Sequence, residues 1–278
     1  MLMKPAKLSV SFNKKCFTPG EEIAFKIKLY SEDEFTIDES IAEFYGIQKL
    51  TYIEGPGGPK HVEETYLFHE LILLERNFKV QPHSKYEWDY AFLLPPDIPP
   101  SYRGDSISVN YSLYVNFKIR HAQTIEKTSS IKIVQKPISP KIIEYKKSFN
   151  SFDVHLKVPD VAIAGFDFAG TLIITPHIEL HFAKIRFDLI REEEVIYGRF
   201  LKHKSIVVRK LRKFIIDESR QLVRDKEYIH RFSIKIPNNL ASFKTEKAIT
   251  RYYGEIHFER KLLPDFSLRF PLKILKIT

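Results

Sequence analysis

The chain has 278 residues, 44% of them hydrophobic and 13% aromatic, so it is long enough for one large or two ordinary domains with apolar cores. Its first ten residues lack the apolar run of a signal peptide, and no later apolar run is long enough to cross a membrane. The single cysteine, Cys16, excludes an internal disulfide framework. We therefore expect a soluble, cytoplasmic protein of a reducing compartment.

Positive charge is confined to the second half of the chain. The net charge is +9, but residues 1–140 carry 17 Lys+Arg and 18 Asp+Glu (17 − 18 = −1), whereas residues 141–278 carry 27 and 17 (27 − 17 = +10). A field of this kind attracts an acidic membrane surface, an acidic protein or nucleic acid. A basic surface with no dedicated partner is the alternative that composition leaves open.

Alternating apolar and polar residues predict strands throughout the first half. Residues 8–12 and 23–29 alternate on either side of the turn signal Thr18-Pro19-Gly20, and the acidic stretch 31–39 is expected to be a loop. The glycines and prolines of 55–59 predict an irregular connection. Further strands of the first half are expected at 41–52, 64–74, 86–94, 107–120 and 129–135.

The second half restarts the same pattern after a candidate linker. Residues 136–148 carry two prolines and four lysines, and we place the linker at 137–148, between domains at 1–136 and 149–278. Segment 207–224 leaves a short helix open, although its charges are scattered. Strands of the second half are expected at 152–156, 166–174, 178–190, 199–208, 226–236, 248–259 and 266–276.

A long internal repeat supports two related domains. Residues 86–117 and 228–259 match at a constant offset of 142, which pairs Tyr86 with Tyr228, Pro95 with Pro237 and Tyr111 with Tyr253. Both copies contain an alternating strand, a proline, an irregular turn and a second alternating strand. We therefore predict an all-β chain of two tandem antiparallel immunoglobulin-like β-sandwiches.

The first copy of this repeat resembles the arrestin-like superfamily. The carrying residues are the Pro19-Gly20 turn between two strands, the strand end Phe92–Pro95, the run Pro100-Ser101-Tyr102-Arg103-Gly104 and the strand that starts at Ile107. The resemblance implies two seven-stranded sandwiches end to end and a short linker. The Pro-Ser-Tyr-Arg-Gly run most resembles the arrestin-like subunit of a Golgi Rab exchange factor, and next the arrestin-like subunits of the retromer and retriever complexes.

Two expectations follow from the residues around this resemblance. Gly104 can adopt a positive φ before the next strand. Because the chain ends at Thr278, shortly after the last expected strand, we expect no counterpart of the C-terminal tail that receptor-binding arrestins displace.

The stretch PHIELHF contains a candidate metal site. On a strand, His177, Glu179 and His181 would share one face, and two imidazoles with a carboxylate suit Zn²⁺ or another transition metal. The polar face of an exposed strand gives the same pattern without a metal, so the sequence leaves both interpretations open.

The strongest local electrostatic signal is the segment 199–214, which has no acidic residue. Such a segment suits anionic lipid headgroups, an acidic peptide or phosphates, while a solvated face is the plainer interpretation. Its basic residues are Arg199, Lys202, Lys204, Arg209, Lys210, Arg212 and Lys213.

The chain has no P-loop, no GxGxxG, no GxSxG and no CxxC motif. We therefore expect no enzymatic activity and no cofactor. The leading hypothesis is an adaptor or scaffold in vesicle-trafficking or signalling complexes, with protein partners such as a small GTPase or exchange-factor or coat-like subunits. A peripheral module for anionic lipid or phosphate and a metal-binding protein are the alternatives. Nucleic acid is an unlikely partner. The Lys-, Glu- and Ile-rich composition is typical of thermophiles and archaea.

Overall fold

The computed structural model describes residues 6–55, 57–198, 202–261 and 263–277. These residues form eighteen strands, and none of them lies in a helix. The all-β prediction is therefore confirmed. Within the same ranges, no helix is long and apolar enough to span a membrane.

The chain divides into two compact units, which are described one at a time. The first unit comprises Met1–Leu50, Val62–Tyr102 and Ser108–Lys136, and the second comprises Thr51–His61, Arg103–Ile107 and Pro137–Thr278. The short pieces at 51–61 and 103–107 therefore cluster with the second unit, although they are ends of strands that begin or continue in the first.

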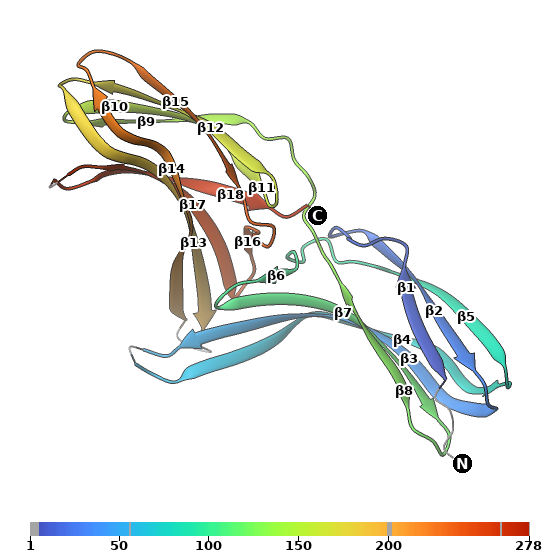
Figure 1. Ribbon diagram of the computed structural model, residues 1–278. Coiled ribbons are helices and arrows are strands. Elements are labelled where there is room, and N and C mark those ends of the chain that lie inside the picture. The colour runs from blue at the N-terminus through green and yellow to red at the C-terminus, as the bar shows by residue number, and fades with distance from the viewer. Residues whose placement is uncertain (1–5, 56, 199–201, 262, 278) are drawn as a thin grey trace. The chain divides into compact units, whose positions relative to one another are not determined.

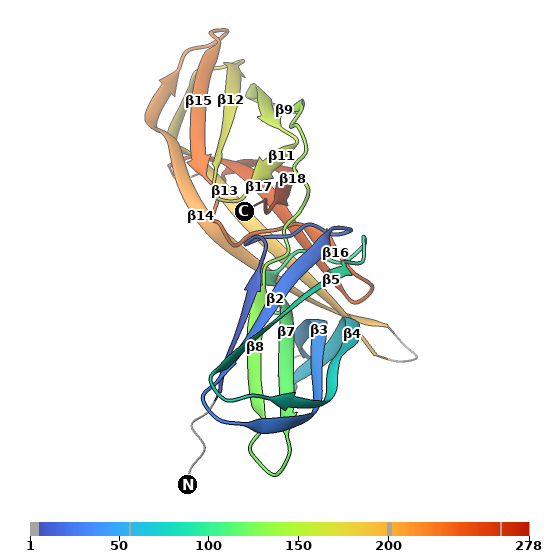
Figure 2. The ribbon, with the colours of Figure 1, turned by 90° about the vertical axis from the view of Figure 1, so that its right-hand side faces the viewer.

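The first unit contains two sheets whose strands alternate buried and exposed side chains. A three-stranded sheet has the order β1-β2-β5, and a second sheet has the order β4-β3-β7-β6 with β8 also paired to β7. Figure 2 shows β2 and β5 in front of β8, β7 and β3. The strand bounds are β1 Lys7–Phe12, β2 Glu22–Ser31, β3 Phe35–Ile53, β4 Lys60–Val80, β5 Ser84–Leu93, β6 Tyr102–Arg103, β7 Ile107–Ile119 and β8 Ile125–Ile131.

The second unit also contains two sheets. One has the order β15-β12-β10-β9, and the other has the order β11-β18-β17-β13-β14 with β16 also paired to β17. Figure 1 shows the two layers. The strand bounds are β9 Ile142–Phe149, β10 Phe152–Pro159, β11 Val161–Ile163, β12 Asp167–Pro176, β13 Leu180–Tyr197, β14 His203–Leu222, β15 Tyr228–Lys235, β16 Phe243–Lys244, β17 Ala248–Glu259 and β18 Phe266–Leu275.

An aromatic cluster joins the two layers of the second unit. Phe152 of β10 is fully buried, and its ring lies 5.2 Å from that of Phe182 on β13 and 5.1 Å from that of Phe258 on β17. Edge-to-face packing of such large side chains removes much apolar surface from water. The inward-facing residues of facing strands therefore make this unit a sandwich.

The internal repeat extends to the order of the strands. In the first unit β2 lies between β1 and β5, and β7 pairs with β3, β6 and β8; in the second unit β12 lies between β10 and β15, and β17 pairs with β13, β16 and β18. The two units therefore repeat one topology, and β9 and β11 are additions to the second copy.

The constant offset of 142 is wrong for the last strand of the repeat. Tyr111 on β7 is 1% exposed, and its counterpart on the inner face of β17 is Tyr252, at 2%, whereas the predicted partner Tyr253 lies on the outer face. The connection before β17 is one residue shorter than the connection before β7. Because side chains alternate along a strand, one missing residue exchanges the two faces.

The proline-rich corner that carries the resemblance is fastened by specific hydrogen bonds. The Tyr111 hydroxyl donates to the carbonyl of Pro99 at 2.6 Å, and burial raises the pKa of Tyr111. The Ser101 amide donates to the Ile133 carbonyl, and the Ile133 amide donates to the Ser101 hydroxyl. Gly104 could adopt a positive φ at this corner, but it is not among the described glycines that do so.

Several predicted boundaries also change. Strand β3 begins at Phe35, inside the stretch expected to be a loop, and the short helix left open at 207–224 is strand β14. The predicted linker 137–148 overlaps β9, which pairs with β10 along its whole length and so is part of a sheet. Only residues 137–141 of that linker lie outside strands.

Candidate binding surface of the second unit

Most of the basic segment lies on β14, at the edge of a sheet. Strand β14 pairs with β13 and is the last strand in its sheet, so its other edge has no strand partner among the described residues. Lys202 is exposed just before β14 begins, and Arg199 lies outside the described residues. The structure thus places the other five basic residues along one edge strand.

Three of these basic side chains are neutralised by carboxylates. Lys204 Nζ lies 2.6 Å from Glu194, Lys210 Nζ lies 2.5 Å from Asp188, and Arg209 Nε lies 3.1 Å from Asp105. The positive charge of these three side chains is therefore partly neutralised by carboxylates of the same unit. The free positive charge of the segment is smaller than its sequence suggests.

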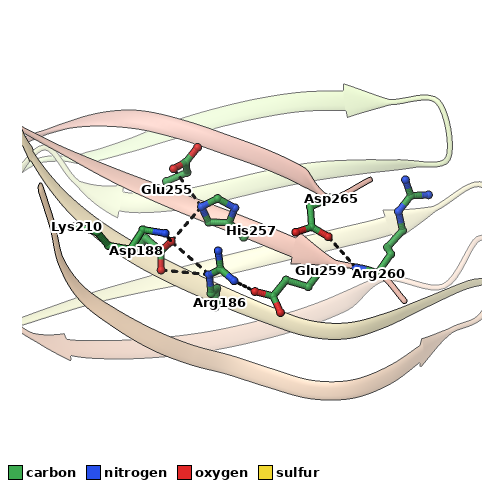
Figure 3. A network of polar contacts seen from close by, with 8 residues as sticks. All are labelled: Arg186, Asp188, Lys210, Glu255, His257, Glu259, Arg260 and Asp265. Carbon is green, nitrogen blue, oxygen red and sulfur yellow. Dashed lines mark hydrogen bonds and ion pairs between the residues drawn. The ribbon is translucent and has the colours of Figure 1, made fainter. Parts of the chain in front are cut away.

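The pair of Lys210 belongs to a network on the outer face of β13, β14 and β17 (Figure 3). The Asp188 side chain is 0% exposed, yet it faces Lys210, the Arg186 Nε at 3.3 Å and the His257 Nε2 at 3.1 Å. A buried carboxylate without such partners would carry a large desolvation cost. The three basic side chains that cover Asp188 therefore offset part of this cost.

Further carboxylates continue this network along β17. Glu255 lies 3.1 Å from the same nitrogen of His257, and Glu259 forms an ion pair with Arg186. At the end of β17, the Asp265 carboxylate accepts the amide of Arg260 at 3.1 Å. The charged side chains of this network interact with one another, which fits a structural role for these residues.

A second group of ion pairs lies nearer the start of β17. Arg251 lies 2.9 Å from Glu192 and 2.7 Å from Glu194. The Lys204 ammonium, followed by Arg251, lowers the pKa of Glu194 below its usual value. Glu194 is therefore a stable anion that holds two strands of the sheet together.

Arg212 and Lys213 differ from Lys204, Arg209 and Lys210, because neither has a carboxylate within ion-pair distance among the described residues. Both line a groove of 630 Å³ between β14 and the end of β15, together with Lys235. Phe214 and Ile234 supply apolar lining, and none of the described lining residues is acidic. The groove lies wholly within the second unit.

A buried histidine lies near this groove. His230 of β15 is 9% exposed, and its Nδ1 lies 3.3 Å from Asp217 of β14. Burial lowers the pKa of His230, and the nearby Asp217 opposes that change. Its Nε2 has no hydrogen-bond partner among the described residues. The neutral imidazole therefore suits this position.

The candidate metal ligands do not share a strand. His177 lies in a bend after β12, Glu179 lies in the connection, and only His181 lies on β13. The His177 Nε2 lies 3.1 Å from Asp153 instead. Among the described residues, no three His, Cys, Asp or Glu side chains form a group that could hold a metal ion. The common strand face that the metal hypothesis required is therefore absent.

Sequence reasoning missed Lys235 and Asp188. Lys235 lies more than 20 residues from the basic segment, and only the pairing of strands brings it to the same groove. Asp188 looks like an ordinary outward-facing residue of an alternating strand. The many charged residues of β13 and β17 were a signal for an ion-pair network. Which of these residues face one another depends on the register between strands, and one strand's sequence does not give that register.

Two comparisons with known proteins bear on the fold. Residues 3–138 match the family model of the arrestin (or S-antigen) C-terminal domain. No curated protein matches the chain. The match falls on the first half of the chain, where the proline-rich corner lies, and the second half repeats the same strand order.

Proteins with an arrestin-like domain are in general non-enzymatic adaptors and scaffolds that bind other proteins. The matched segment, the all-β structure and the repeated topology agree with one another. The chain therefore has an arrestin-like, all-β sandwich fold.

Proposed function

We propose that this protein is a non-catalytic adaptor or scaffold that binds protein partners through sheet faces and open strand edges. The main support is that the second unit has two edge strands, β14 and β15, beside a groove. Most of the clustered charged side chains of this unit form ion pairs with one another, which fits a structural role. An edge strand offers unpaired backbone groups to an extended segment of another protein.

The proposal extends to the two domains. Each unit supplies a sandwich, the second of which includes β9, and we assign each its own contact surface. The repeated strand order supports this division, as does the boundary between Lys136 and Pro137. Binding surfaces on two sandwiches would let one chain hold two partners.

The setting that we propose is membrane trafficking or signalling on the cytoplasmic side of a membrane. The support is the likeness of Pro100-Ser101-Tyr102-Arg103-Gly104 to arrestin-like trafficking subunits. A small GTPase, or a subunit of an exchange factor or coat, is the kind of partner that this likeness suggests.

The test is purification of tagged full-length protein from its native cells at about 0.05 and about 0.15 M salt, followed by reconstitution from purified components. The proposal predicts one or more defined proteins that co-purify and reform a stoichiometric complex with the recombinant chain. Recovery of no protein that rebinds the purified chain at either salt concentration would contradict the proposal.

A second candidate function is binding to anionic lipid. It is favoured by exposed Arg212 and Lys213 together with Ile206 and Val208, which are each 54% exposed on the same strand. Each basic residue near an anionic surface adds about 1 kcal/mol, so this binding would be weak and sensitive to salt. Flotation with anionic vesicles tests it, and unchanged binding by the Arg212→Glu, Lys213→Glu variant would eliminate it.

That variant is preferable to one that also reverses Lys210. A glutamate at position 210 would face the buried Asp188 carboxylate, so a loss of binding would be confounded with loss of structure.

A further inference from the structure

We propose that the groove between β14 and β15 binds an extended acidic peptide, which pairs its backbone with the free edge of β15 and its carboxylates with Arg212, Lys213 and Lys235. This inference rests on the proposed adaptor function and names the chemistry of one partner.

The edge of β15 presents backbone groups to the groove. Ile236, just after β15, donates its amide to Phe166 and accepts from Gly165, so its backbone faces the neighbouring β12 side. Hydrogen-bonding direction alternates along a strand. Lys235 and Ser233 therefore direct their amide and carbonyl groups away from β12, and both residues line the groove. Four residues of such an edge span about 13 Å, which suits a short extended segment.

Irregularities in β14 shape the opposite wall. The β13–β14 register shifts between Ile185 and Arg186 and again between Leu189 and Ile190, which leaves Ile216 and Leu211 of β14 without a partner in the register. A bulge bends a strand and redirects its side chains. The residues between the two bulges include Arg212, Lys213 and Phe214, which are the β14 residues that line the groove.

The charge of the groove selects an acidic occupant. Its three ionisable lining side chains are all basic, and none has a carboxylate within ion-pair distance among the described residues. Asp188 lies opposite Lys213 in the strand register, but its carboxylate already faces Lys210, Arg186 and His257. The positive charge of the groove is therefore available to a partner.

The apolar lining favours a peptide over a phosphate or a lipid headgroup. Phe214, Ile234 and Ile236 line the groove beneath its basic rim, and Asn238 and Asn239 add amide groups at one end. An extended peptide with alternating acidic and apolar residues satisfies the rim, the lining and the free backbone edge together. A phosphate would use only the rim.

The experiment measures binding of a fluorescent heptapeptide of alternating glutamate and valine to the full chain by anisotropy. The control peptide has the same sequence with lysine in place of glutamate, so its charge is reversed. We expect saturable binding of the glutamate peptide, weakened about tenfold or more by Arg212→Glu, Lys213→Glu and Lys235→Glu together. The matched control reverses three exposed lysines that have no ion pair within the described part of the chain, namely Lys146, Lys244 and Lys261, and it should bind as the unaltered chain does.

A backbone variant separates strand pairing from charge attraction. Ser233→Pro removes an amide that faces the groove, and proline is tolerated on an edge strand whose amide points outward. We expect this variant to keep its fold by circular dichroism and to lose most peptide binding. Hydrogen exchange of the unaltered chain should show slower exchange of the Ser233 and Lys235 amides when the glutamate peptide is present.

Three results of the binding assays would each overturn the inference. They are no binding of the glutamate peptide, equal binding by the groove and control variants, or binding of anionic vesicles but not of the peptide. If the triple groove variant retains every co-purifying partner, the groove inference fails while the adaptor proposal stands. If no partner exists at all but the peptide binds, the adaptor proposal fails instead.

Discussion

Replacing Lys210 by methionine tests whether the buried Asp188 side chain depends on its basic partners for stability. Lys210 lies 2.5 Å from a carboxylate that is 0% exposed, and its loss leaves Arg186 at 3.3 Å and His257 at 3.1 Å. Breaking a buried ion pair costs about 3–5 kcal/mol. Because Lys210 is 37% exposed and Arg186 remains, we expect the free energy of unfolding to fall by about 2–3 kcal/mol.

Urea denaturation measures this change. Far-UV circular dichroism follows both units, whereas Trp88, the single tryptophan, lies on β5 and reports on the first unit. We expect the dichroism transition to move to lower urea without an equal shift of the Trp88 transition. The matched control is Lys213→Met on the same strand, which has no carboxylate partner and should change stability by less than about 0.5 kcal/mol.

A double-mutant cycle completes the test. Asp188→Asn removes the buried charge, so Lys210→Met should cost clearly less in that background than in the unaltered chain. A loss below about 0.5 kcal/mol for Lys210→Met alone, or an equal loss in both backgrounds, would refute the reasoning.

Three further predictions concern packing, hydrogen bonding and pH. Tyr111→Phe should lower the free energy of unfolding by about 1–2 kcal/mol in urea melts, because the Pro99 carbonyl loses its 2.6 Å donor; no loss would show that this bond is not needed. Gly254→Ala should cost about 1–3 kcal/mol by the same assay, because the new Cβ would lie 2.3 Å from the Phe270 ring; a neutral result would mean that the ring moves freely. Burial lowers the pKa of His230 below 6.5, so the unfolded chain takes up its proton first and stability should fall as pH drops below 6.5; a His230→Phe variant should have a flatter pH profile, and an unchanged profile would contradict the assignment.

Strand content was predictable because the chain alternates so regularly. The strand predicted at 248–259 has the bounds of β17, and the one predicted at 266–276 differs from β18 by one residue. Local alternation needs no knowledge of partners. The segment 207–224 was open to a helical interpretation because two bulges interrupt the alternation of β14, so its charged residues do not follow the period of a strand.

Pairing between strands was not predictable from one sequence. Lys204, Arg209 and Lys210 read as free positive charge, but Lys204 and Lys210 each meet a carboxylate of the neighbouring strand β13, and Arg209 meets Asp105, which lies far away in the sequence. The repeat was detectable, yet Tyr111 was paired with Tyr253 instead of Tyr252, because one residue is missing before β17. Long-range register decides which charges are free, and a local pattern does not contain it.

The claim that the protein works by holding a partner is tested most directly by hydrogen exchange on a complex reassembled from the chain and a protein that co-purifies with it. We predict a lasting complex, with backbone amides slowed along an exposed strand edge of at least one unit and the partner recovered chemically unchanged. A partner that leaves in an altered covalent form, with no amide slowed anywhere in the chain, would contradict the account.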